Sequence, residues 1–199
     1  MVARFGYKTV MTTGLLIVTG AQLGLTQLRL DTPLWFVLVV FFFFGFGMGN
    51  VIAPASTVMQ NVLPIARVGA GSAVQNTVRQ VFGAFGIAIV GTLLATHYAS
   101  KSAPALASLP SGARDAASQS IIATDAVLKQ ALAGGAPADA ISAARTGAYE
   151  AFLSATHLTS WIAAGVVLLG AIIVFFLLPK ISPPTRASVA VVPPIAVVE

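Results

Sequence analysis

The feature that most restricts the fold is the near absence of charge between Pro33 and His97, where Arg67 and Arg79 are the only charged residues. Over all 199 residues, 57% are hydrophobic and 9% are charged, and the mean hydropathy is +0.90. Soluble domains carry roughly 25% charged residues. Because so little charge cannot cover a folded chain in water, the sequence predicts a membrane protein.

Four stretches are apolar enough, and near enough to the about 20 residues that a span needs, to be predicted as membrane-spanning helices. They cover residues 9–28, 33–60, 72–97 and 157–178. Arg4 and Lys8 also fit the charged start of a signal peptide, but threonines interrupt the apolar run and no small-residue cleavage site follows, which favours a span.

The segment between the third and fourth spans, residues 98–156, changes to Ala, Ser and Gly with charges of both signs. Helical periodicity covers Arg114–Ala133, where Gly134 and Gly135 are expected to end a helix. A second helix is expected to begin near Pro137 and continue into the last span. The predicted fold class is therefore an all-α membrane domain over residues 1–180, with a long, partly helical loop. The prolines of residues 181–199 predict a disordered tail.

The distribution of charge predicts the orientation of the spans. If the N-terminus is in the cytoplasm, the segments on the cytoplasmic side carry the whole net charge of +5. The positive and negative charges on the other side sum to zero. The basic residues of the first side are Arg4, Lys8, Arg67, Arg79, Lys180 and Arg186. Since basic residues favour the cytoplasmic side, both termini are predicted to be cytoplasmic. The spread of these charges over separate patches argues against binding of nucleic acid.

Two neighbouring spans, within residues 45–91, carry small and polar residues on one face each. Gly45, Gly49 and Ala53 recur every four residues, and Gly20 and Gly24 form a similar pair in the first span. The later helix has one face, here called the polar stripe, formed by Ser72, Asn76, Arg79, Gly83 and Gly86. Small residues allow helices to approach closely in lipid, so the glycines are predicted to be packing positions. An arginine in such an apolar segment should face protein or water.

The polar residues of these two spans are the candidates for a substrate pathway. Asn50, Asn76 and Gln80 either line such a pathway or form hydrogen bonds between helices. Arg79 either reaches a phosphate or carboxylate at the cytoplasmic interface or takes part in gating and substrate passage. Pro54 removes a backbone donor and is predicted to kink its helix, or to act as a hinge. Arg67 is predicted to set the topology.

Few residues are available for chemistry. The chain has no cysteine, and its two histidines, His97 and His157, have no acidic residue at metal-ligand spacing on a shared helical face. None of the six acidic residues falls within a predicted span. We therefore predict no catalytic residue, metal or cofactor, and no enzymatic activity.

The residues just described resemble the late part of a major facilitator superfamily (MFS) transporter, in particular the fourteen-helix drug/proton antiporters of the EmrB/QacA type. The matching pattern is Gly45-x-Gly47-x-Gly49, Pro54, Pro64, Arg67, Gly71-Ser72, Asn76, Arg79-Gln80 and Gly83-x-x-Gly86. The stretch from Ala3 to Lys8, with Arg4 and Gly6, resembles the short basic turn of that superfamily, although Ala3 replaces its usual acidic residue.

The resemblance implies that the four spans are the last four helices of a C-terminal bundle in a bacterial inner (plasma) membrane. It implies a fragment of a multidrug efflux transporter that exchanges small amphipathic or cationic compounds for protons, with lipid and the missing N-terminal helices as partners. Such a fragment is not expected to transport alone. The alternative is a stand-alone four-helix membrane protein that assembles with itself or with a partner, with its glycine faces between molecules.

Overall fold

A computed structural model describes residues 2–64 and 67–178, and the predicted tail at 181–199 lies outside these residues. Six helices follow in order: α1 (Val2–Leu25), α2 (Leu34–Val62), α3 (Val68–Ser102), α4 (Ser111–Ala117), α5 (Ile121–Ala133) and α6 (Ala138–Leu177). No strand occurs among the residues that the structure describes. The all-α prediction is therefore confirmed.

Three of these helices are long and apolar enough to cross a membrane, namely α2, α3 and α6. The predicted span at 9–28 falls mostly in α1, which is not among the three. Its threonines dilute its hydropathy, yet Thr12, Thr13 and Thr19 each donate a hydrogen bond to the carbonyl oxygen four residues earlier. This bonding satisfies the hydroxyl groups within the helix. The structure thus differs from the predicted four spans at α1.

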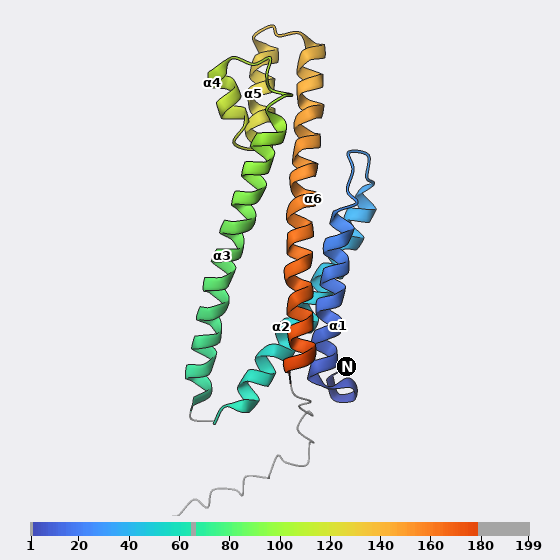
Figure 1. The fold of residues 1–199 in the computed structure, drawn as a ribbon, viewed down its shortest axis with the longest axis vertical. Coiled ribbons are helices and arrows are strands. Elements are labelled where there is room, and N and C mark those ends of the chain that lie inside the picture. The colour runs from blue at the N-terminus through green and yellow to red at the C-terminus, as the bar shows by residue number, and fades with distance from the viewer. Residues whose placement is uncertain (1, 65–66, 179–199) are drawn as a thin grey trace, which may run out of the picture.

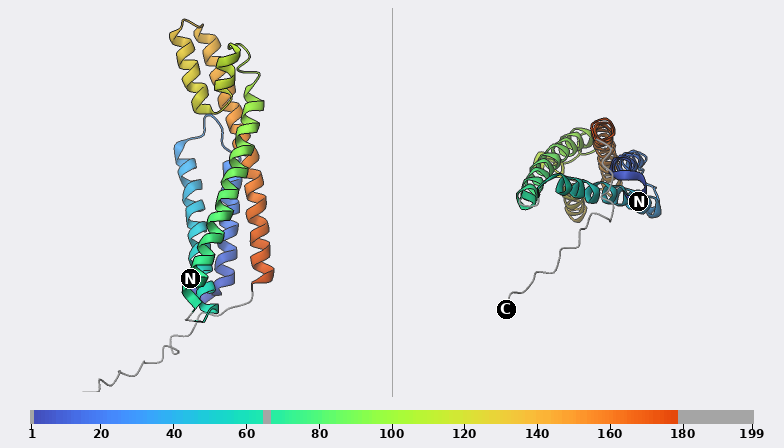
Figure 2. Two further views of the ribbon diagram at one scale, coloured as in Figure 1. Left: turned by 90° about the vertical axis from the view of Figure 1, so that its left-hand side faces the viewer. Right: turned by 90° about the horizontal axis from the view of Figure 1, so that it is seen from below.

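Helix α1 packs against both α2 and α6, and α3 packs against α6 at its far end (Figure 1). The N-terminal end of α1, the α2–α3 connection and the C-terminal end of α6 lie at the same end of the molecule, drawn at the bottom. The α1–α2 loop points toward the other end, where α4 and α5 form a cap (Figure 2).

Helices α1 and α2 meet backbone to backbone at two glycines. A Cβ atom added at Gly14 would lie 2.9 Å from the Gly47 carbonyl oxygen, and one added at Gly47 would lie 2.8 Å from the Gly14 carbonyl oxygen. These distances leave no room for any side chain. Gly24 likewise faces Val40, whose Cγ2 atom would lie 3.0 Å from an added Cβ. Close approach through small residues is the usual way in which membrane helices pack.

Helix α6 presents a buried seam of small residues to its neighbours. Its buried positions are Ala144, Ala148, Ala151, Ala155, Thr159, Ser160, Ala164 and Ala171. The three- and four-residue spacing keeps them on one face of the helix. This seam gives no clear signal in the sequence, because alanine is common throughout the segment and neighbouring alanines mask its period.

The cap is a compact unit, called the headpiece here, formed by residues 94–155. Its core comprises Leu106, Leu109, Ala117, Leu128 and Ala144, and a second cluster joins Tyr98 to Ala151 and Ala155. The predicted end of a helix at Gly134–Gly135 and the predicted continuous helix from Pro137 into the last span are both confirmed. The expected helix over Arg114–Ala133 is instead two helices, because Ser120 caps α5 by accepting a hydrogen bond from the Ala123 amide.

Candidate substrate-pathway site

Helices α2 and α3 meet only near the connection between them. Arg67 is the residue that precedes α3, and its exposed side chain forms no capping hydrogen bond. Gly71 faces Leu63 so closely that an added Cβ would overlap the leucine side chain. One turn further, Gln75 Nε2 donates a hydrogen bond of 3.1 Å to Ser56 Oγ on α2. This link was not predicted, since Gln75 lies beside the polar stripe and was not singled out.

From Asn76 onward, the polar stripe lies on the part of α3 that has no neighbour within the described chain. Ser72 is half-buried, but every residue from Asn76 to Thr92 is exposed, whichever face of the helix it occupies. Arg79 Nη2 donates a hydrogen bond of 3.1 Å to Asn76 Oδ1. Gln80 is exposed beside them. The prediction that this stripe faces other helices or water stays a prediction, because the chain itself covers no face of this segment.

The two candidates on α2 are closer to the packed part of the molecule. Asn50 is half-buried and donates a hydrogen bond of 2.8 Å to the Phe46 carbonyl oxygen, while its Cβ atom lies against Gly14. Pro54 is buried within α2, which continues on both sides of it. Among the described residues, no hydrogen bond joins Asn50 to Asn76, Arg79 or Gln80. The five candidates therefore do not form one polar cluster.

Most of the predicted packing glycines are open within the described residues, so helix packing at them stays a prediction. No described atom lies within 4 Å of a Cβ added at Gly20, Gly45, Gly49, Gly83 or Gly86, and Ala53 is exposed. Of the residues predicted to pack helices, Gly24 alone does so here, whereas the close contact belongs to Gly14 and Gly47. The glycines of the pattern GFGMG lie on two faces of α2. Helix α1 packs against the face that carries Gly47.

The residues of the predicted basic turn lie at the lower end of the molecule. Arg4 lies before Gly6 in the first part of α1, and Gly6 breaks the helix with a φ of 74°, a value that glycine adopts without strain. The half-buried Lys8 ammonium lies 5.2 Å from the centre of the Phe175 ring, so a cation–π contact joins the start of α1 to the end of α6. Arg67 directly precedes α3, whose first turn lies at the same end (Figure 1).

Ion pairing among the described residues is confined to the headpiece. Asp125 pairs with Arg145, whose Nε atom lies 2.9 Å from Oδ1, and with Lys129, whose Nζ atom lies 3.1 Å from Oδ2. The hydrogen bonds from Arg145 and then Lys129 lower the pKa of the Asp125 carboxyl below its ordinary value. This network links α5 to α6 at the surface of the headpiece.

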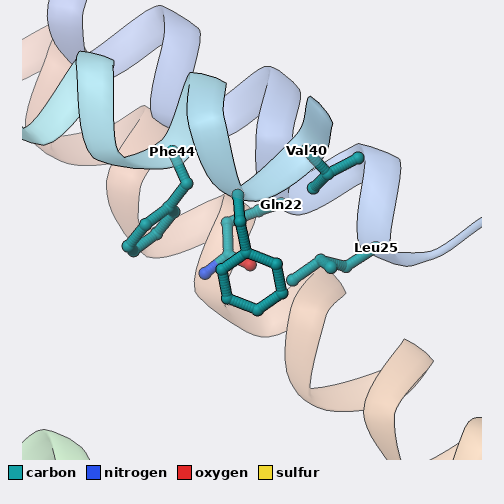
Figure 3. A pocket seen from close by; sticks show the side chains of 5 residues that line it. Gln22, Leu25, Val40 and Phe44 are labelled. Carbon is teal, nitrogen blue, oxygen red and sulfur yellow. The ribbon is translucent and has the colours of Figure 1, made fainter. Parts of the chain in front are cut away.

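Two hollows accompany the α1–α2 hairpin. An apolar groove of about 130 Å³ is lined by Gln22, Leu25, Val40, Phe41 and Phe44, and the Gln22 amide points into it between the aromatic rings (Figure 3). A second, more open hollow of about 440 Å³ lies between the α1–α2 loop and α6. We call it the loop pocket, and its lining residues are Leu28, Arg29, Leu30, Glu150, Leu153, Ser154 and His157.

The two histidines form hydrogen bonds to the protein. His157 Nε2 lies 2.8 Å from the Leu28 carbonyl oxygen, which can only accept, so this nitrogen carries the proton. His97 Nε2 lies 3.1 Å from Ser154 Oγ. Within residues 2–64 and 67–178, no group of three His, Cys, Asp or Glu side chains could hold a metal ion.

These features define an all-α membrane protein whose polar groups lie on helices rather than in a catalytic cluster. The chain is 31% identical over 90 residues to the uncharacterized MFS-type transporter YhcA of Bacillus subtilis, an alignment that covers 45% of the chain and 17% of the relative. It is 28% identical over 102 residues to the tetracenomycin C resistance and export protein of Streptomyces glaucescens, which covers 49% and 18%.

The matched region spans less than a fifth of the length of these curated relatives. No family profile matches the chain, and no solved structure matches it. The similarity covers about half of the chain and supports a relation to MFS-type transporters. It does not distinguish the fourteen-helix branch that the sequence analysis predicted.

Proposed function

We propose that this chain forms part of an MFS-type exporter and supplies helices of its C-terminal bundle. The similarity to two transporters over about half of the chain is the observation that carries the proposal. The exposed polar stripe of α3 agrees with it, because a transporter needs polar side chains at the interface between its two helical halves.

Within that proposal, Asn76, Arg79 and Gln80 face the substrate pathway, and Asn50 and Pro54 belong to its α2 side. The polar stripe would face the remaining helices of the transporter and a water-filled cavity. There an arginine within the membrane avoids the high free-energy cost of contact with lipid. We extend the proposal to export of small amphipathic or cationic compounds in exchange for protons. Because no acidic residue lies in α2, in residues 68–100 of α3 or in residues 151–177 of α6, the coupling carboxylate would come from the other helices.

The proposal also includes the orientation with both termini in the cytoplasm of a bacterial cell. Lys8 lies near the start of α1 and Arg67 precedes α3, and these two helix starts lie at one end of the molecule (Figure 1). This supports the orientation, because basic residues favour the cytoplasmic side. The headpiece would then lie outside the cytoplasm.

The test is proton-driven efflux of ethidium from cells that produce the chain joined to the other helices of the transporter. Asn76→Ala and Arg79→Ala are expected to slow efflux, whereas Val81→Ala, on the opposite face of α3, is the matched control and is expected to leave it unchanged. Unchanged efflux in both polar variants would remove the polar stripe from the pathway.

A self-assembling membrane protein is the second candidate, and the uncovered half of α3 favours it too. In that case the open glycines Gly83 and Gly86 would pack against another copy. Oligomeric state in lipid nanodiscs separates the two: Gly83→Leu would convert a self-assembled form to monomers, and it would leave a monomeric transporter segment unchanged.

A further inference from the structure

We propose that the loop pocket binds the headgroup of a zwitterionic aminophospholipid, with the phosphate at Arg29 and the primary ammonium at Glu150. Both charged residues line the same hollow, and its volume of about 440 Å³ gives space for a polar group of that size. This inference does not depend on the proposed transport function.

The depth of the pocket in the membrane is the first argument. Helix α6 has 40 residues and is therefore about 60 Å long, at a rise of about 1.5 Å per residue. The hydrocarbon layer is about 30 Å thick, so only half of α6 fits within it. The half from Leu158 to Leu177 is free of charge, which places His157 and the loop pocket beside the headgroup layer.

Two exposed tryptophans mark the same level. Trp35 lies at the start of α2, directly after the α1–α2 loop, and Trp161 lies one turn from His157 on α6. Their exposed fractions are 64% and 59%. Tryptophan is enriched at the interface between hydrocarbon and water. The pocket and the expected lipid headgroups therefore occupy the same layer.

The charges of the loop pocket are complementary to those of a zwitterionic headgroup. Arg29 and Glu150 have opposite charges, and neither takes part in an ion pair with a described residue, since such pairs are confined to Asp125 and its partners. Asp31 is exposed and does not line the pocket. A ligand with one phosphate and one ammonium group would satisfy both side chains at once, whereas an anionic headgroup would satisfy Arg29 alone.

Part of the lining of the loop pocket is apolar. Leu28, Leu30 and Leu153 share the pocket with the two charges, and the exposed fraction of Leu30 is 54%. A soluble zwitterion would leave these leucines in water. The glycerol region and first methylene groups of a membrane lipid would cover them, which favours a lipid over a free headgroup.

Quenching of tryptophan fluorescence tests the proposal. The chain with Trp35→Phe, which leaves Trp161 as the reporter, is placed in nanodiscs that contain brominated phosphatidylethanolamine in a phosphatidylcholine background, and in the reverse arrangement. We expect brominated phosphatidylethanolamine to occupy the site about fivefold more favourably than brominated phosphatidylcholine, because its primary ammonium donates hydrogen bonds to a carboxylate and a quaternary ammonium has no N–H to donate. Equal quenching by the two lipids would overturn the proposal.

Two charge variants and their controls locate the effect. Glu150→Gln and Arg29→Gln are each expected to abolish the preference, whereas Asp139→Asn and Lys101→Gln, which change exposed charges outside the pocket, are expected to keep it. A preference that survives both pocket variants would contradict the proposal. Circular dichroism of each variant confirms that its helices are intact.

A soluble competitor and an anionic lipid separate the alternative ligands. Excess glycerophosphoethanolamine is expected to leave the quenching unchanged, because it lacks the acyl chains; its displacement of the lipid would overturn the assignment to a membrane lipid. Brominated phosphatidylglycerol is expected to bind more weakly than phosphatidylethanolamine, and stronger binding would show that Glu150 plays no part.

Discussion

The two halves of α3 have opposite surroundings. At the headpiece end, Tyr98 is 2% exposed and Ser102 is fully buried, and residues of α5 and α6 pack against Tyr98. In the other half, Phe82 and Ile87 have exposed fractions of 72% and 77%. A headpiece that projects beyond the hydrocarbon, as we propose, must complete its own core, because exposed apolar surface is costly in water. In hydrocarbon such exposure costs nothing, so only polar and small residues indicate a missing neighbour.

The core of the headpiece provides the most severe test of this difference. Leu128 is 1% exposed and packs among Leu106, Leu109 and Ala144. Leu128→Ala should lower the free energy of unfolding of the headpiece by roughly 2–5 kcal/mol. Hydrogen exchange measured by mass spectrometry should show faster exchange across residues 101–150 and no change in residues 76–92. Uniform loss of protection in both regions would mean that the two halves of α3 are not independent.

The same substitution at one glycine in each region sharpens the comparison. A Cβ added at Gly147 would lie 2.5 Å from Ala105 Cβ, which cannot rotate away, whereas one added at Gly83 meets no described atom within 4 Å. Gly147→Ala is expected to destabilise the headpiece by about 1–3 kcal/mol. Gly83→Ala should keep or slightly raise the melting temperature of the isolated chain, because alanine is favoured over glycine in a helix by about 0.5–1 kcal/mol. Thermal unfolding in detergent measures both, and equal effects would contradict the open surroundings of Gly83.

The hydrogen bond from Gln75 to Ser56 marks the boundary of the uncovered half. Gln75→Leu removes the donor, and we expect a loss of about 0.6 kcal/mol, the average for such bonds in membranes. Gln80→Leu, one turn further on the uncovered segment, is the matched control and should have no effect on stability. A larger loss at Gln80 would indicate contacts that the chain forms in that segment.

The smallest expected effect concerns pH. Because its partners lower the pKa of Asp125 in the folded state, the carboxylate stabilises the headpiece above its ordinary pKa of 3.8. That stabilisation should be lost as the pH falls through the lower pKa of the folded form. The melting temperature of the headpiece should therefore fall on acidification below about pH 4, and Asp125→Asn should reduce this fall. The same dependence in the variant would assign the effect to other groups.

The sequence predicts the helices better than it predicts their contacts. The apolar stretches locate the long helices, and Gly134–Gly135 marks the end of α5. Both signals are local. The break at Ser118–Ser120 was missed, since Ser120 competes for the backbone with a continuous helical pattern. Whether Gly45 or Gly47 meets α1 depends on how α1 packs against α2, and a pattern with glycine at both positions does not contain that information.

The candidate site shows the same limit. The sequence identifies the polar stripe from its spacing, and the structure places its residues on one exposed segment of α3. The hydrogen bond between Gln75 and Ser56 joins residues that are far apart in the sequence. The loop pocket does the same, because its opposite charges, Arg29 and Glu150, come from distant segments. Such pairs, which depend on tertiary packing, leave no periodic signal.

The central claim is that the polar stripe of α3 faces protein or water, not lipid. The chain has no cysteine, so single cysteines can be introduced at Asn76 and Gly83 and, as controls on the opposite face, at Val78 and Val81. Labelling with a water-soluble maleimide, in membranes that contain the chain joined to the other transporter helices, should be fast at the first pair and slow at the second. Slow labelling at the stripe, with quenching of attached probes by lipid spin labels, would contradict the claim.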